Sequence, residues 1–186
     1  NANGYLYAGD PCSAESCQIG GNLATNAGGN KAVRYGVTRN QVYGVEIVTP
    51  TGEIVELGAP LKKCSTGYCM EQLVIGSEGT LGIITKVILK LQPLPPYRID
   101  LLAVFTDPVQ AMSVVPKIAK AGINPTSIEY MDNANVRTTS RFLDFAGAPH
   151  LDKGIYVIIT IETFDEDELD TKMEQTNDIC EECGAI

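Results

Sequence analysis

Apolar and polar residues alternate with a period of two in short runs over the first half of the chain, which predicts β-strands. The runs cover residues 42–49, 54–57 and 81–91. The apolar face of the third run carries Ile83, Val87, Leu89 and Leu91, with Thr85. Lys86 and Lys90 lie on its other face. This spacing predicts a half-buried strand with Ile83 on its apolar face.

Turn and cap residues connect these runs. The segment Thr49-Pro50-Thr51-Gly52 has proline at the second turn position and glycine at the fourth, which favours a type I turn and a hairpin. Residues 68–75 are predicted to form a short helix, with Thr66 as its N-cap and Gly76 as its stop. Tyr35 and Tyr68 are predicted to fill the core.

The pattern changes at the proline-rich segment 91–96, which a regular element cannot cross. We place a domain boundary there, between residues 1–96 and 97–186. Beyond it, the predicted strands cover 99–105, 127–131 and 155–161, and the predicted helices cover 108–121, 133–142 and 166–182. This alternation predicts a ferredoxin-like α+β layer.

The first helix after the boundary has recognisable signals at both ends. Asp107 fits its N-cap, Pro108 fits its first turn, and Gly122 fits its stop. Pro116 lies inside this helix and is predicted to kink or split it. The acidic run that begins the last predicted helix complements the helix dipole, which favours a solvated helix start over a cation site.

Composition and charge exclude several classes of protein. With 44% hydrophobic and 20% charged residues, the chain is globular. No run of eighteen apolar residues and no signal-peptide pattern occurs, so we expect no transmembrane segment and a cytoplasmic location. A net charge of −9, with 14 scattered basic residues, argues against binding to nucleic acid.

Six cysteines occur in three pairs, Cys12 and Cys17, Cys64 and Cys69, and Cys180 and Cys183. Only the last pair has the CxxC spacing of a metal hook, and His150 is the only histidine. Because zinc needs four ligands, we predict no metal site and reduced thiols.

Two glycine-rich segments, GGNLATNAGGN at 20–30 and GSEGTLG at 76–82, carry the candidate chemistry. Gly20, Gly21, Gly28 and Gly29 give the backbone the freedom to adopt positive φ and to let an anionic diphosphate approach its N–H groups. Asn22, Thr25 and Asn26 could hydrogen-bond phosphate or ribose oxygens. A tight structural turn is the alternative.

The second segment enters a predicted strand, so its glycines would bring strand backbone against a flat ligand such as a flavin. Glu78 is either a polar anchor for that ligand or a turn residue. Neither GxGxxG after a strand nor GxxxxGK[ST] is present, so Rossmann and Walker-type sites lose support.

These segments resemble a known family. DPCSAESCQIGGNLATNAGGN and the continuous match from about residue 10 to 95, with STGYCMEQLVIGSEGTLGIIT, are similar to vanillyl-alcohol-oxidase (PCMH-type) FAD enzymes. The branch is that of the glycolate oxidase large subunit, the FAD-linked D-lactate dehydrogenases and the D-2-hydroxyglutarate dehydrogenases. SIEYMD at 127–132 resembles the start of their substrate cap.

The resemblance implies an α+β fold. Residues 1–96 would be the C-terminal part of the FAD-binding domain, and residues 97–186 would begin a truncated ferredoxin-like substrate cap. It also implies FAD contacts at Pro11, Cys12, Ser13, Ser16, Cys17, Gln18, Gly20, Gly21, Asn22, Thr25, Asn26, Ala27, Gly28, Glu78, Gly79, Gly82, Ile83 and Ile84.

The implied activity is oxidation of a D-2-hydroxy acid, glycolate or D-lactate, to the 2-keto acid. Electrons would pass to an iron–sulfur subunit, an electron-transfer flavoprotein or a quinone, with peripheral membrane attachment through a partner. His150 matches no flavin-linking position, so non-covalent FAD is expected, and catalytic residues are expected outside this chain. The chain alone is expected to bind FAD weakly or not at all. The alternatives are an alkylglycerone-phosphate-synthase-like enzyme and a flavin-free structural subunit.

Overall fold

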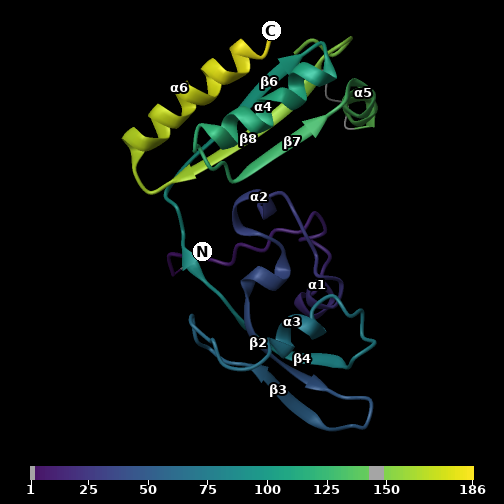
Figure 1. Ribbon diagram of the computed structural model, residues 1–186. Helices are drawn as coiled ribbons and strands as arrows, with labels where there is room; N and C mark the ends of the chain where they lie inside the picture. Colours follow the sequence, from purple (N-terminus) through teal and green to yellow (C-terminus); the bar gives the residue numbers. More distant parts are fainter. Residues whose placement is uncertain (1–2, 143–148) are drawn as a thin grey trace. The chain divides into compact units, whose positions relative to one another are not determined.

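The computed structural model describes residues 3–142 and 149–186 of the chain. The chain divides into two compact units, Asn1–Leu94 and Pro95–Ile186, which we describe separately (Figure 1). Among the described residues, no helix combines the length and the apolar character needed to cross a membrane.

The first unit is built around the antiparallel sheet β3-β2-β4. Its elements are β1 (Tyr5–Leu6), α1 (Ile19–Thr25), α2 (Ala32–Tyr35), η1 (Thr38–Gln41), β2 (Val42–Val48), β3 (Ile54–Gly58), α3 (Met70–Val74), β4 (Ile83–Leu89) and β5 (Gln92–Pro93). β1 and β5 form a separate two-stranded sheet. The core joins α1 and α3 to the sheet through Leu23, Val42, Val45, Ile47, Val74 and Ile75.

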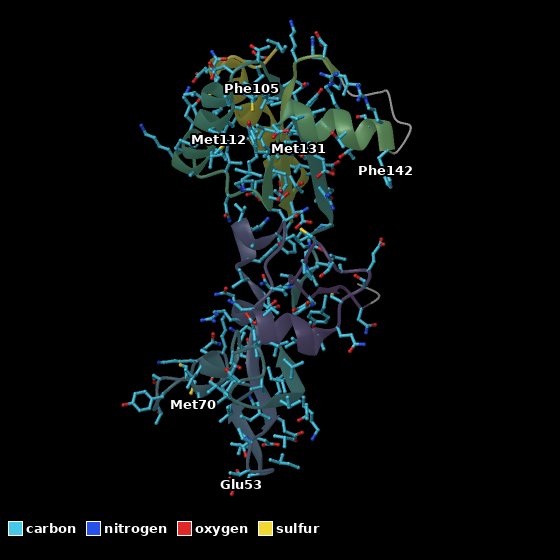
Figure 2. The ribbon with its side chains drawn as sticks, turned by 90° about the vertical axis from the view of Figure 1, so that its right-hand side faces the viewer. Glu53, Met70, Phe105, Met112, Met131 and Phe142 are labelled. Carbon is cyan, nitrogen blue, oxygen red and sulfur yellow. The ribbon has the colours of Figure 1, made fainter. Side chains whose placement is uncertain are left out.

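The predicted hairpin between β2 and β3 is confirmed. The N–H of Gly52 donates to the carbonyl of Thr49 at 2.9 Å, and Gly52 has a φ of 85°. The N–H of Thr49 then donates to the carbonyl of Glu53, the residue labelled at the hairpin end in Figure 2. Glycine is needed at this turn because a side chain disfavours positive φ.

The predicted apolar face of β4 is partly wrong because the strand carries a β-bulge. Glu46 pairs with Lys86, but the next residue, Ile47, pairs with Ile84, so Thr85 is left without a cross-strand partner. The extra residue reverses the alternation of faces beyond it. Ile84 packs against the core, whereas Ile83 is 63% exposed.

The short helix before the second glycine segment also differs from its prediction. α3 begins at Met70 with Cys69 as its N-cap, so Thr66 does not cap it. Tyr68 is 92% exposed, so the prediction that it fills the core is wrong. Gly76 follows the helix with a φ of 87°, in agreement with its predicted role as a stop.

The second unit is the predicted ferredoxin-like α+β layer. It contains β6 (Tyr97–Phe105), α4 (Pro108–Lys120), β7 (Ser127–Met131), α5 (Asn133–Phe142), β8 (Ile155–Thr163) and α6 (Glu166–Glu182). β8 lies between β6 and β7 and is antiparallel to both, so β6 and β7 run parallel. α4 and α6 pack on β6 and β8 and on each other (Figure 1). Phe105, Val114, Ile118, Ile159 and Ile161 fill the layer between them.

The start of α4 follows its sequence signals. The carboxylate of Asp107 accepts hydrogen bonds from the N–H groups of Val109 at 2.7 Å and Gln110 at 3.2 Å. This confirms the predicted N-cap, which satisfies donors that have no partner inside the helix. Pro116 lies inside α4 without splitting it.

Phe105 anchors the core of the second unit and is fully buried (Figure 2). We expect Phe105→Ala to lower the free energy of unfolding by about 3–5 kcal/mol, because it leaves a cavity between sheet and helices. Denaturant unfolding followed by circular dichroism measures this loss. Phe164→Ala is the matched control, because Phe164 is 55% exposed, and we expect it to cost within about 0.5 kcal/mol. Equal losses would contradict the core assignment.

A charge pair next to the bulge should make the stability of the fold depend on pH at the acid side. Lys86 Nζ donates to Glu46 Oε2 at 2.6 Å, and Thr85 Oγ1 donates to Glu46 Oε1 at 2.8 Å. These bonds, that of Lys86 first, lower the pKa of Glu46 below its ordinary 4.5. The pair therefore stabilises the folded chain above that pH, and this stabilisation is lost as the pH falls through the lowered pKa.

We expect Glu46→Gln to remove this pH dependence. Its urea midpoint should lie below that of the unmodified chain at neutral pH, and the two midpoints should converge as the pH falls below 4.5. Glu174→Gln, at an exposed position of α6, serves as the control and should show no such convergence. A midpoint difference that persists in acid would exclude the carboxylate as its source.

Candidate functional site

The two glycine-rich segments lie against each other in the first unit. The N–H of Gly76 donates to the carbonyl of Leu23 and the N–H of Glu78 to that of Ala24, both at 2.9 Å. Leu23 and Ala24 lie in the last turn of α1, where the carbonyl of Leu23 also accepts from the N–H of Asn26, the C-cap residue, at 3.1 Å. The second segment therefore closes the end of the helix that the first segment forms.

The conformations of the first segment differ from the prediction. Gly20 and Gly21 lie inside α1, and none of Gly20, Gly21, Gly28 and Gly29 has a positive φ. Positive φ occurs instead at Asn26, which ends α1 with a φ of 51°. It also occurs throughout the second segment, at Gly76, Glu78, Gly79 and Gly82. The predicted backbone freedom is real but belongs mainly to residues 76–82.

Two kinds of close approach explain the glycines of the first segment. A Cβ built on Gly20 or Gly21 meets no atom within 4 Å, so this side of α1 presents bare backbone. A Cβ on Gly29 would lie 1.7 Å from the carbonyl oxygen of Asp10. Gly29 is therefore required by the packing of the chain on itself, whereas Gly20 and Gly21 leave room for an external group.

The polar side chains of the first segment hold its own backbone. Thr25 Oγ1 donates to the carbonyl of Gly21 at 3.0 Å. Asn22 is buried, and its Nδ2 lies 3.3 Å from the sulfur of Cys17. The side-chain oxygen of Asn26 accepts from the N–H of Arg39 at 3.0 Å. The carbonyl of Ala27 accepts from both the N–H and the hydroxyl of Thr38.

The segment before α1 forms a polar depression of about 460 Å³, lined by Asp10, Pro11, Cys12, Ser13, Ala14, Glu15, Ser16 and Asn30. Four of these residues were predicted to line FAD: Pro11, Cys12, Ser13 and Ser16. Cys17 and Gln18 do not line the depression but lead from it into α1, where Gln18 is the N-cap. Within the segment 11–18 that was predicted to line FAD, the first part therefore lines the depression and the last two residues lead into α1.

In the second segment, two glycines differ in their surroundings. A Cβ on Gly82 would lie 2.8 Å from the carbonyl oxygen of Val48, so this glycine lets the turn pack on β2. A Cβ on Gly79 would meet only Ile83, at 3.9 Å. Glu78 is a turn residue with a φ of 52°, and its exposed carboxylate also remains available to a ligand. Both proposed roles of Glu78 are thus compatible with the fold.

Arg39 joins the two segments, a role that the sequence pattern did not indicate. Its Nη2 donates to the carbonyl of Ile75 at 3.0 Å, directly before Gly76, while its N–H donates to Asn26. Gln72 Nε2 reaches the carbonyl of Arg39 at 3.4 Å. The partners lie 13 to 36 positions away in the sequence, so local pattern could not have identified this residue.

Tyr7 packs against Gly9, directly before the segment that forms the depression. Its ring occupies the space where a Cβ of Gly9 would lie, at 2.5 Å. Burial raises the pKa of the Tyr7 hydroxyl, and the nearby thiol of Cys17 raises it further. Tyr7 therefore stays neutral and supports the start of the loop by packing.

Together these features fit a holder for a large, partly anionic cofactor such as FAD. The bare backbone at Gly20 and Gly21 admits close approach, and the N–H groups of the first helical turn lack acceptors within the helix. The hydroxyls of Ser13 and Ser16 add further polar groups. Within residues 3–142 and 149–186, no three His, Cys, Asp or Glu side chains are grouped to hold a metal ion.

Two families of known proteins match the chain. The description "FAD binding domain" matches residues 1–58, and "FAD linked oxidases, C-terminal domain" matches residues 94–186. The solved structure of an alkyldihydroxyacetonephosphate synthase superposes on this chain with a TM-score of 0.79 at 25% sequence identity. The superposition covers 100% of this chain and 35% of the synthase chain.

Similar curated proteins include a D-lactate dehydrogenase of Anaerostipes hadrus, 40% identical over 98% of this chain. The glycolate oxidase subunit GlcD of Bacillus subtilis (strain 168) is 36% identical over 100% of it. The chain spans 39% of the length of each of these two proteins. A D-2-hydroxyglutarate dehydrogenase of Stutzerimonas stutzeri (strain A1501) is 50% identical over 50% of this chain. That match covers 20% of the length of the dehydrogenase. Because the second family description covers half of the chain, the chain belongs to the FAD-linked oxidases.

Proposed function

We propose that this chain is part of an enzyme that oxidises a D-2-hydroxy acid, such as glycolate or D-lactate, to the 2-keto acid. The observation that carries the proposal is the similarity of nearly the whole chain to a D-lactate dehydrogenase and to GlcD, at 36–40% identity. The substrate loses a proton and a hydride, so two electrons must leave it. We propose that they pass to an acceptor other than NAD.

In this proposal, residues 1–96 are the C-terminal part of an FAD-binding domain and residues 97–186 are part of a substrate cap. FAD, bound without a covalent link, would supply the redox chemistry. The bare backbone of Gly20 and Gly21 would face its diphosphate side. The depression at residues 10–16 would line another part of it, and residues 78–84 would border the nucleotide. Arg39 would keep α1 and the second segment in register.

The name of one similar protein supports a proposal for the electron acceptor. GlcD is named as a subunit of glycolate oxidase, which supports a partner subunit for this chain as well. We propose an iron–sulfur subunit or an electron-transfer flavoprotein as that partner. Such a partner would also provide peripheral attachment for an otherwise cytoplasmic enzyme.

A second candidate is an FAD enzyme of the alkylglycerone-phosphate-synthase type. The likeness to the solved synthase over the whole chain favours it specifically. A flavin-free subunit of the same fold is the third candidate. The three differ in whether FAD binds and in whether a 2-hydroxy acid reduces it.

We expect the complete protein to bind FAD and to lose its oxidised-flavin absorbance when D-lactate or glycolate is added without oxygen. Absorbance spectroscopy in an anaerobic cuvette measures this change, with L-lactate as the stereochemical control. Bound FAD that no 2-hydroxy acid reduces would sink the dehydrogenase proposal and favour the synthase. Complete protein that takes up no FAD would favour the flavin-free subunit.

The bare helix surface at Gly20 allows a substitution that should raise the stability of the folded protein and lower its affinity for FAD. Gly20→Ala should stabilise the folded protein without cofactor by up to about 1 kcal/mol, because alanine favours the helix and meets no neighbour. FAD affinity should fall by at least about tenfold, or 1.4 kcal/mol, because the methyl group keeps the diphosphate from the backbone. Thermal unfolding and fluorescence titration measure the two effects.

Gln175→Ala, at an exposed position of α6, is the control and should change neither quantity appreciably. Unchanged affinity in the stabilised Gly20→Ala variant would remove this side of α1 from the proposed FAD contact.

A further inference from the structure

The segment between β3 and α3 carries two thiols that the proposed function does not use. Cys64 and Cys69 are both exposed and both free. The chain bends between them at Thr66 and Gly67, and Gly67 has a φ of 74°. Cys69 is the N-cap of α3, directly before Met70, which is labelled in Figure 2. One thiol thus lies at the start of the helix and the other lies on the far side of this bend.

Both thiols line a single depression of about 420 Å³. Its wall is formed by the same segment together with residues of β2 and the start of α3, so Cys64 and Cys69 line one depression. The described residues give neither sulfur a hydrogen-bond partner. Two free thiols that line one depression and are separated by a short loop can be joined with little loss of chain entropy.

The other cysteines occupy different environments. Cys12 lies 3.7 Å from the side-chain oxygen of Asn30, and Cys17 contacts the carbonyl of Ala14 and the amide of Asn22. Cys180 and Cys183 are buried, and burial raises the pKa of Cys180 to about 11, which keeps it a thiol. Cys12 and Cys17 have the same five-residue spacing as Cys64 and Cys69 and therefore form a natural comparison within the chain.

We propose that Cys64 and Cys69 are a redox-sensitive pair that closes to a disulfide when a peroxide oxidises the protein. One thiolate attacks an oxygen of hydrogen peroxide and becomes a sulfenic acid, and the O–O bond breaks to release water. The second thiol attacks that sulfur, the S–S bond forms and a second water leaves. Two thiols thus lose two electrons and two protons, and one peroxide is reduced to two waters.

The test uses the complete protein, treated with a small excess of hydrogen peroxide, alkylated with iodoacetamide and digested with trypsin without reductant. Cleavage after Lys63 and Lys86 yields a peptide that contains Cys64, Cys69 and no other cysteine. We expect this peptide to lack both alkyl groups and to be lighter by two hydrogen atoms than its reduced form. Dithiothreitol before alkylation should restore both labels.

The comparison peptide carries Cys12 and Cys17, and we expect it to remain alkylated at the same peroxide dose. Cys64→Ser should abolish the loss of two hydrogens and leave Cys69 alkylated or trapped by dimedone as a sulfenic acid. Three results would each overturn the proposal: full alkylation of Cys64 and Cys69 at doses that oxidise Cys12, conversion of either residue to a sulfinic or sulfonic acid, or a cross-link to a different cysteine. Because flavin plays no part in the readout, failure here is distinguishable from failure of the proposed function.

Discussion

The first unit depends on two backbone hydrogen bonds that close the end of α1. A seven-residue helix containing two glycines is marginal by itself, because glycine costs about 1 kcal/mol in a helix and short helices nucleate poorly. The N–H groups of Gly76 and Glu78 supply donors to its last carbonyls and so stabilise it from outside. Arg39 fixes the same junction from the side. The helix and the turn are therefore one structural element assembled from distant parts of the sequence.

This dependence explains why the glycines of the two segments have different tasks. Residues 76–82 must bend sharply to present two N–H groups to α1, and four of them have positive φ. The first segment is helical and needs glycine for a different reason, because Gly20 and Gly21 leave the helix surface bare. Gly29 serves only the packing of the chain against Asp10. A count of glycines alone could not separate these three requirements.

The second unit could be predicted well from sequence because its signals are local. The bounds of β7, α5 and α6 follow from periodicity, and Asp107 marks the start of α4 by a hydrogen bond within three residues. In the first unit, the hairpin was equally accessible through Pro50 and Gly52. The helix at Gly20 and the bridging role of Arg39 were not, because both depend on partners far away in the sequence. For the candidate site, sequence therefore indicated which segments matter but not how their side chains are used.

The bulge at Thr85 determines which residues of β4 face the core. If Thr85 paired as an ordinary strand residue instead of bulging, strict alternation would turn Ile83 inward and Ile84 outward. Because Thr85 bulges out of the pairing, Ile84 keeps its place opposite Ile47 and against the core. A related chain that lacked only the residue at position 85 would therefore pair this strand with β2 without a bulge and would still bury the residue that corresponds to Ile84.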